Sequence, residues 1–144
     1  MAPLGSENVS RKVIIEVEMN LSDYFDNTQG SGVLATADSS GLVNAAVYAR
    51  PHFIDEKTLA FIMRERLTYE NLQTNPHSTY LFIESKPGYT GKRLYLTKIR
   101  EETNDELVAG ICRRCDYSMF TEPLMRHVVF FTIDKVLPLI GSGS

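Results

Sequence analysis

The sequence lacks the features that mark secreted, membrane-spanning and nucleic-acid-binding proteins. It has only two cysteines, Cys112 and Cys115, which are too few for a disulfide framework. No stretch approaches the roughly 18 consecutive apolar residues that would span a bilayer, and residues 1–12 lack the apolar run of a secretory signal. The net charge is −3, whereas nucleic-acid-binding surfaces usually carry a clear basic excess. We therefore expect a cytoplasmic protein that binds small molecules, with no nucleic-acid or membrane partner.

The length and composition indicate one globular domain. The chain has 144 residues, of which 43% are hydrophobic, enough for a core in a domain of the usual ~100–150 residues. No internal repeat or change of composition marks a boundary. We expect a single domain over residues 1–144, with flexible ends at residues 1–11 and 140–144.

Alternation of apolar and polar residues over residues 13–19, and β-rich runs bounded by turn-forming residues elsewhere, predict a mainly antiparallel sheet. Residues 32–38 and 42–49 are separated by Ser39, Ser40 and Gly41, a cluster typical of a hairpin turn. A second turn at residues 55–58 leads into a third strand. This third strand is residues 59–63, and the other predicted strands are residues 13–19, 79–84, 93–100 and 128–137. Residues 85–92 are the longest candidate for a flexible loop.

Two short helices are predicted from capping residues and stop signals. Ser22 is placed to cap a helix that runs through Phe25, and residues 68–75 form a polar helix that Pro76 ends. A third helix of about twelve residues follows the capping-box spacing of Thr103 and Glu106.

The two cysteines stand at C-x-x-C spacing on this third helix, which could indicate a redox pair or half of a zinc site. A tetrahedral zinc site needs two more ligands. The three histidines, at positions 52, 77 and 127, are scattered. Cys112 and Cys115 also share a helical stripe with Val108 and Ile111, so we interpret them as buried thiols and predict no metal site.

The segment from Arg64 to Asn71 has the composition of an anion site. Arg64, Arg66 and Thr68 fall between the end of a strand and the beginning of a helix. Free backbone N–H groups and the positive end of the helix dipole favour an anion at such a junction, and arginine supplies a fork-shaped charge. The alternative is that both arginines are solvated and that Thr68 only caps the helix.

Residues 42–52 (LVNAAVYARPH), 59–68 (LAFIMRERLT), Asn71-Leu72 and Asn75-Pro76 resemble the flavin-binding core of the pyridoxamine 5′-phosphate oxidase-like family. The resemblance runs from about Gly32 to Arg100. It implies a mainly β fold, namely an antiparallel split β-barrel of Greek-key type that binds FMN.

The resemblance also implies the residues that would bind FMN. In the family, the second barrel strand lies along the isoalloxazine ring, the end of the third strand contributes backbone contacts, and the following helix junction holds the phosphate. Carried over to this sequence, the residues that face the ring would be Val47, Tyr48, Ala49 and Arg50, and Arg93 would lie against the ring edge. The strand end would be Met63 and Arg64. The phosphate junction would be formed by Arg66, Leu67 and Thr68, with Asn71 on the helix behind it. No catalytic residue is predicted.

The sequence departs from the family pattern in two places. The oxidases carry a basic pair where this chain has Leu67 and Thr68, and Arg64 and Arg66 would share one face and supply the missing charge if the chain were extended. The C-terminal section that binds the substrate of the true oxidases has no recognisable counterpart, so vitamin B6 oxidation is not assigned.

The resemblance implies an FMN-dependent oxidoreductase with a small-molecule redox partner. It also implies a homodimer with FMN at the subunit interface, for which Val43, Ala45, Val47 and Tyr48 are the candidate contacts. Two alternatives remain open: a non-catalytic FMN or haem module, acting as carrier or sensor, and a structural dimer with an inactive site.

Overall fold

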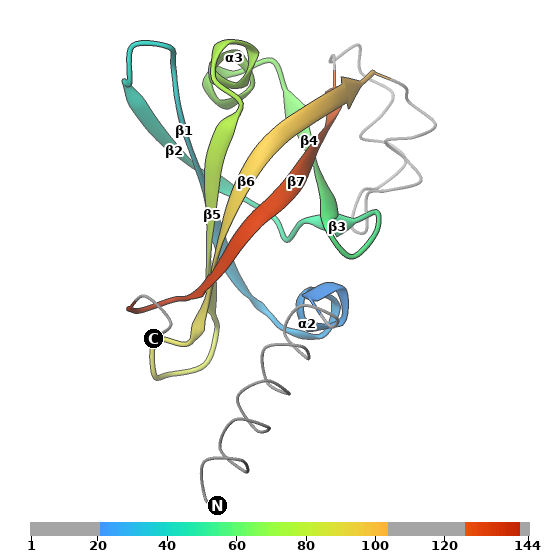
Figure 1. Ribbon diagram of the computed structural model, residues 1–144. Coiled ribbons are helices and arrows are strands. Elements are labelled where there is room, and N and C mark those ends of the chain that lie inside the picture. The colour runs from blue at the N-terminus through green and yellow to red at the C-terminus, as the bar shows by residue number, and fades with distance from the viewer. Residues whose placement is uncertain (1–20, 104–125, 142–144) are drawn as a thin grey trace, which may run out of the picture.

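The computed structural model describes residues 21–103 and 126–141. These residues form two helices, α2 (Leu21–Asn27) and α3 (Leu67–Thr74), and one sheet of seven strands (Figure 1). The strands are β1 (Gly30–Ala37), β2 (Val43–Tyr48), β3 (His52–Phe53), β4 (Thr58–Arg64), β5 (His77–Glu84), β6 (Gly91–Glu102) and β7 (Arg126–Pro138). Neither described helix is long and apolar enough to cross a membrane.

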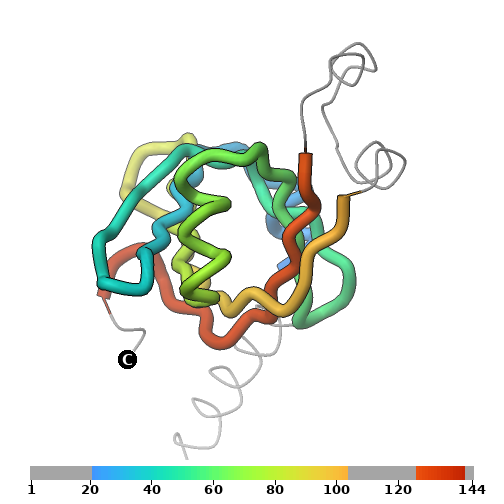
Figure 2. The backbone as a smooth tube through the Cα atoms, turned by 90° about the horizontal axis from the view of Figure 1, so that it is seen from above, coloured from blue at the N-terminus to red at the C-terminus, as the bar shows by residue number. Residues whose placement is uncertain are grey.

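The strands are antiparallel throughout and lie in the order β2-β1-β5-β6-β7-β4-β3. The sheet curves strongly, so that seen from above it surrounds a central core, and α3 lies across one end (Figure 2). Its two outer strands, β2 and β3, do not pair with each other. The predicted mainly β, antiparallel split barrel is therefore confirmed as an open barrel.

The hairpin between β1 and β2 is formed by its turn residues, as the sequence predicts. One carboxylate oxygen of Asp38 accepts hydrogen bonds from the N–H groups of Ser40 and Leu42, at 2.8 and 3.0 Å. Gly41 has φ of +89°, which side chains with a Cβ rarely tolerate. This turn sets the register in which Leu34 pairs with Ala46 and so decides which face of β2 points inward.

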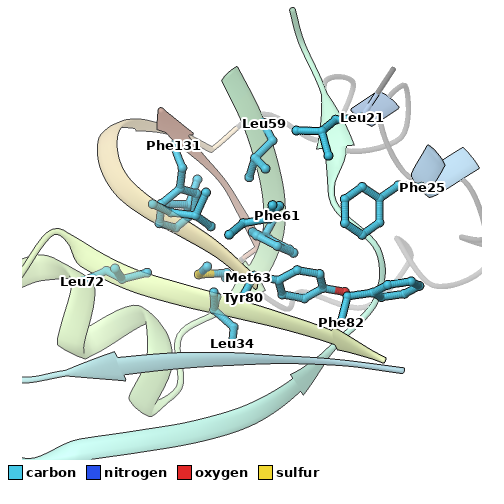
Figure 3. Close-up of a cluster of buried hydrophobic side chains, with 13 residues drawn as sticks. Leu21, Phe25, Leu34, Leu59, Phe61, Met63, Leu72, Tyr80, Phe82 and Phe131 are labelled. Carbon is cyan, nitrogen blue, oxygen red and sulfur yellow. The ribbon is translucent and has the colours of Figure 1, made fainter. Parts of the chain in front are cut away.

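The core lies between the curved sheet and the two helices (Figure 3). Each buried Phe or Leu side chain here contributes about 1.5–3 kcal/mol relative to exposure. The Phe25 ring, from α2, meets the Phe82 ring edge-on at 5.0 Å between centroids, so α2 is held against β5. The buried hydrophobic residues of this cluster are Leu21, Phe25, Leu34, Leu59, Phe61, Met63, Leu72, Tyr80, Phe82, Leu94, Leu96, Val129 and Phe131.

The connection after β2 carries the chain away from that strand, so the third predicted strand, β4, is not its neighbour. β4 pairs with β7 and β3, not with β2, and β3 is an additional short strand. Pro51 is buried in the connection, and proline has no N–H to continue a ladder. The chain therefore leaves β2 here and crosses to the other edge of the sheet, where β3 and β4 lie.

The helix predictions are confirmed where the structure describes them. α3 begins and ends one residue earlier than predicted, and α2 covers the expected segment, but Ser22 lies within α2 rather than capping it. The strand predicted over residues 13–19 and the helix that would carry Cys112 and Cys115 lie outside the described residues.

Candidate functional site

The junction between β4 and α3 is a tight turn centred on Glu65. The Arg66 N–H donates to the Arg64 carbonyl at 2.8 Å, and Arg66 itself has an extended backbone, with φ of −121° and ψ of −171°. Because α3 begins at Leu67, its first-turn N–H groups have no acceptor within the helix. They point along the helix axis toward the same place as the positive end of the dipole.

Thr68 is the buried hydroxyl group of this junction. It is 3% exposed, and the Asn44 side-chain amide donates to its Oγ1 at 3.4 Å. The Tyr48 hydroxyl also lies close enough to Thr68 for that side chain to lower its pKa. Asn44 and Tyr48 lie on the inner face of β2, so this strand is held beside the beginning of α3 (Figure 1).

Tyr48 stays in its neutral form at this position. Burial raises the pKa of Tyr48, whereas the Thr68 side chain and the positive charge of Arg66 lower it; the net pKa lies above the usual value. The phenol is therefore a hydrogen-bonding group of the junction that places no negative charge there.

Arg66 is the exposed cation of the junction. Among the described residues, its guanidinium forms no ion pair with a carboxylate. Arg64 is half-buried and stands opposite Arg126 in the β4–β7 ladder. The expectation that Arg64 and Arg66 share one face assumed an extended chain, and the turn at Glu65 removes that basis.

The other residues predicted at the strand end and at the phosphate junction have distinct surroundings. Met63 is 1% exposed in the core, so only its backbone can reach a ligand. Leu67 is 53% exposed at the start of α3. The buried Asn71 amide donates to Thr36 Oγ1 at 3.1 Å, which fastens α3 to β1.

The residues predicted to face the ring alternate between the two faces of β2. Val47 lies on the outer face and is 81% exposed. Ala49, in the connection that follows β2, is also exposed, whereas Tyr48 points inward. The Tyr80 hydroxyl lies 3.2 and 3.1 Å from the carbonyl oxygens of Tyr48 and Ala49 and holds this end of the strand. A flat ligand along the outer face would thus meet Val47, Ala49 and the backbone.

Two arginines that were predicted to contact the flavin ring donate to backbone carbonyl groups in this structure. Arg50 Nη1 donates to the Phe25 carbonyl at 2.7 Å, at the C-terminal end of α2. Arg93 Nε donates to the Pro138 carbonyl at 2.9 Å, where β6 begins. Within the described chain this end of β6 is opposite to α3 (Figure 1), so Arg93 is not brought to the junction.

Asn44 is the site residue that the sequence interpretation missed. Its signal is the two-residue period of β2, which places residue 44 on the inner face with Tyr48. A polar side chain there needs a hydrogen-bond partner, and the partner, Thr68, is identified only by the fold.

The donor set of this junction fits a phosphate monoester. Backbone amides, the Thr68 hydroxyl, the Asn44 amide and the Arg66 fork are the groups that bind such anions. Among the described residues, no group of three or more His, Cys, Asp or Glu side chains could hold a metal ion.

Comparisons with known proteins identify the fold. No family model matches the chain, and no curated protein sequence matches it. Many solved structures are similar to this chain, and three of them illustrate the likeness. An FMN-binding protein from Syntrophomonas wolfei subsp. wolfei has a TM-score of 0.73 and 20% identity over 96% of this chain and 97% of its own.

The second structure is a protein from Clostridium acetobutylicum related to general stress protein 26 of B. subtilis, of the pyridoxinephosphate oxidase family. Its TM-score is 0.63, with 14% identity over 85% of this chain and 88% of its own. The third is an F420 reductase with a TM-score of 0.58 and 15% identity, over 74% of this chain and 88% of its own. This chain therefore has the split-barrel fold of the FMN-binding and pyridoxamine 5′-phosphate oxidase-like proteins.

Proposed function

We propose that the protein is an FMN-binding flavoprotein whose β4–α3 junction holds the phosphate of the cofactor. The observation that carries the proposal is the buried Thr68 hydroxyl at the beginning of α3, with Asn44 and Tyr48 against it. Arg66 stands beside this group without a carboxylate partner among the described residues. The similarity of the fold to an FMN-binding protein supports the same assignment.

Different residues around the junction would bind the phosphate and the ring of FMN. Arg66, Thr68 and the first N–H groups of α3 would bind the phosphate, because charge-assisted hydrogen bonds contribute about 1.5–3 kcal/mol each. The backbone of Met63 and Arg64 and the end of β2 would lie along the ring. When bound, FMN supplies the electron or hydride transfer, while the protein positions and tunes it.

We propose that a second copy of the chain covers the outer face of β2 and completes the flavin site. Val43 and Val47 are 77% and 81% exposed, and Ala45 between them lies on the same exposed face. The apolar row continues across the two neighbouring strands, because Val47 pairs with Val33 of β1 and Val33 pairs with Leu81 of β5. An exposed apolar strip on neighbouring strands is typical of a protein interface, and a two-fold dimer would bury it on both subunits.

For activity, we propose an oxidoreductase that uses a nicotinamide, a flavin or another small electron carrier. The reductase and oxidase-family proteins among the similar structures support a redox role. Location in the cytoplasm remains a prediction from the sequence. The loop between β5 and β6 has an exposed Tyr89 with φ of +52°, and such loops commonly carry substrate selectivity.

A non-catalytic module that holds FMN, or haem, on the same barrel is the second candidate. The side chains at the junction are hydrogen-bond donors and one arginine, and Tyr48 has a raised pKa. These groups bind anions and are poor proton-transfer groups at neutral pH. A flavin spectrum without oxidation of nicotinamides would favour this candidate.

The test of the function is a spectrum followed by a paired titration. The purified protein should show flavin absorbance, or acquire it when FMN is added. FMN should bind more tightly than riboflavin, which lacks only the phosphate. Equal affinities for FMN and riboflavin would contradict the phosphate site, and colourless protein that binds neither would indicate the structural dimer with an inactive site.

A further inference from the structure

His127 lies in β7 beside the proposed phosphate junction, although about sixty residues separate the two along the chain. It stands opposite Met63 in the β4–β7 ladder and is 5% exposed. Its Nε2 is 2.9 Å from Oε1 of Glu65, and its Nδ1 is 2.6 Å from Oγ1 of Thr103. Because a carboxylate accepts hydrogen bonds, these partners assign the proton to Nε2 and make the Thr103 hydroxyl the donor to Nδ1.

The same imidazole ring is stacked on Tyr69. The ring centroids are 4.3 Å apart and the planes differ by 16°. Tyr69 is the third residue of α3, in the helix turn whose N–H groups would face the anion. One side chain of β7 therefore contacts both the turn residue Glu65 and the first turn of α3.

These two contacts bracket the anion-binding residues. Arg66, Leu67 and Thr68 lie between Glu65 and Tyr69, so the segment that donates to the proposed phosphate is held at both ends by His127. A loop ordered before the ligand arrives loses less conformational entropy on binding. Exact placement of several donors also depends on such supporting contacts.

The contact with His127 also fixes where the negative charge of Glu65 lies. Among the described residues, His127 is the hydrogen-bond partner of this half-exposed carboxylate. The contact keeps it on the β7 side of α3, whereas β2 adjoins the other side with Asn44 and Tyr48 (Figures 1 and 2). A freed carboxylate next to Arg66 could pair with that arginine and repel an anion.

Glu101 cannot replace Glu65 in this arrangement. It lies 3.8 Å from His127 Nδ1, but its other carboxylate oxygen is 3.2 Å from Lys98 Nζ. The negative charge of Glu101 is thus compensated by Lys98 within β6. Glu65 depends on the imidazole, and this dependence links β7 to the junction.

We propose that His127 is a positioning residue that holds Glu65 and Tyr69 so that the Arg66–Thr68 segment is ready to bind a phosphate. The inference rests on the proposed function, because it concerns the same junction. His127 does not touch the ligand itself; it acts through its two contacts. Its effect should therefore be specific to the phosphate and absent for a ligand without one.

The test compares two substitutions of His127 in the full-length protein, titrated with FMN and with riboflavin. His127→Phe keeps a flat ring against Tyr69 but removes both hydrogen bonds, and it should weaken FMN by about tenfold, the effect of one charge-assisted hydrogen bond. Riboflavin affinity should not change. His127→Gln keeps an N–H that can reach Glu65 and should restore most of the FMN affinity. His77→Gln, at an exposed histidine, is the matched control and should bind like the wild type.

Thermal unfolding of each variant separates positioning from general destabilisation. A merely structural role would lower the melting temperature without changing the ratio of FMN to riboflavin affinity, and that result overturns the proposal. Unchanged FMN binding by folded His127→Phe also overturns it. Tyr69→Leu keeps the test open if His127→Phe does not fold, because it removes the stacked ring and should also lower the preference for FMN. If the wild type itself does not prefer FMN, the proposed function fails, rather than the role of His127.

Discussion

Tyr80 occupies the space where a side chain at position 32 would lie. A Cβ atom on Gly32 would be 2.6 Å from Cε1 of the Tyr80 ring and closer still to its hydroxyl oxygen. Tyr80 is fully buried, and its hydroxyl donates to the carbonyl oxygens of Tyr48, the last residue of β2, and of Ala49. The absence of a side chain in β1 thus lets a tyrosine of β5 reach across and support β2.

Gly32→Ala should destabilise the protein by about 1–3 kcal/mol or more, because overpacking a filled core forces side chains from their rotamers. Chemical denaturation measures the loss. Gly32→Ala combined with Tyr80→Phe should recover only part of it, since the ring carbons remain in the way. Wild-type stability of Gly32→Ala would mean that Tyr80 does not cross β1 in this way.

Arg66→Ala should weaken FMN by about tenfold, because one charge-assisted contact with the phosphate is lost. Stability should change little, since the side chain is exposed. Fluorescence titration with FMN and riboflavin measures both affinities. Arg64→Ala is the control and should retain the preference for FMN; the reverse pattern would show that the other arginine faces the phosphate.

Arg50→Gln should lower the free energy of unfolding by about 1–2 kcal/mol, because the guanidinium binds carbonyl groups at the C-terminal end of α2. The ratio of FMN to riboflavin affinity should stay the same. Urea unfolding and paired titrations test this directly. A stable variant with poor flavin binding would instead place Arg50 against the ring, as the family resemblance implies.

Stability should fall as the pH rises above about 10, the usual pKa of tyrosine. Burial, a hydrogen bond with Glu101 and the negative charges of Glu101 and Glu65 raise the pKa of Tyr69 to about 12 in the folded protein. The unfolded chain therefore loses this proton first, and the stability contribution is full below pH 10 and is lost toward pH 12. Tyr69→Phe should show a shallower decline in urea unfolding across this range; an identical slope would contradict the assignment.

Val47→Asp should convert a dimer into monomers and weaken FMN at the same time. A charge on the exposed face of β2 would be buried without a partner in the proposed interface. Sedimentation over a concentration series, with and without FMN, measures the linkage, since a ligand bound by the dimer should stabilise it. Ile54→Asp, in the β3–β4 turn and also exposed, is the control. A monomeric wild type with full flavin affinity would exclude a shared site.

Local structure in this protein was largely predictable from the sequence. The turn at Gly41, the β-rich runs of β1 and β2, and the helix stopped by Pro76 all depend on residues close together in the chain, and each was confirmed. The strand-to-helix junction was also predictable, because it needs only the end of one pattern and the start of another. Its assignment to a phosphate remains a prediction.

The tertiary structure decided which residues far apart in the sequence contact one another. The pairing of β4 with β7 brings His127 to Glu65, and the curvature of the sheet brings Asn44 to Thr68; neither contact has a local signal, because both depend on which strands become neighbours. Arg50 and Arg93 illustrate the same limit, since their sequence positions suit a ligand but nearby carbonyl groups bind them in the fold. Sequence periodicity determines which face of a strand is buried, whereas long-range packing determines what that face meets.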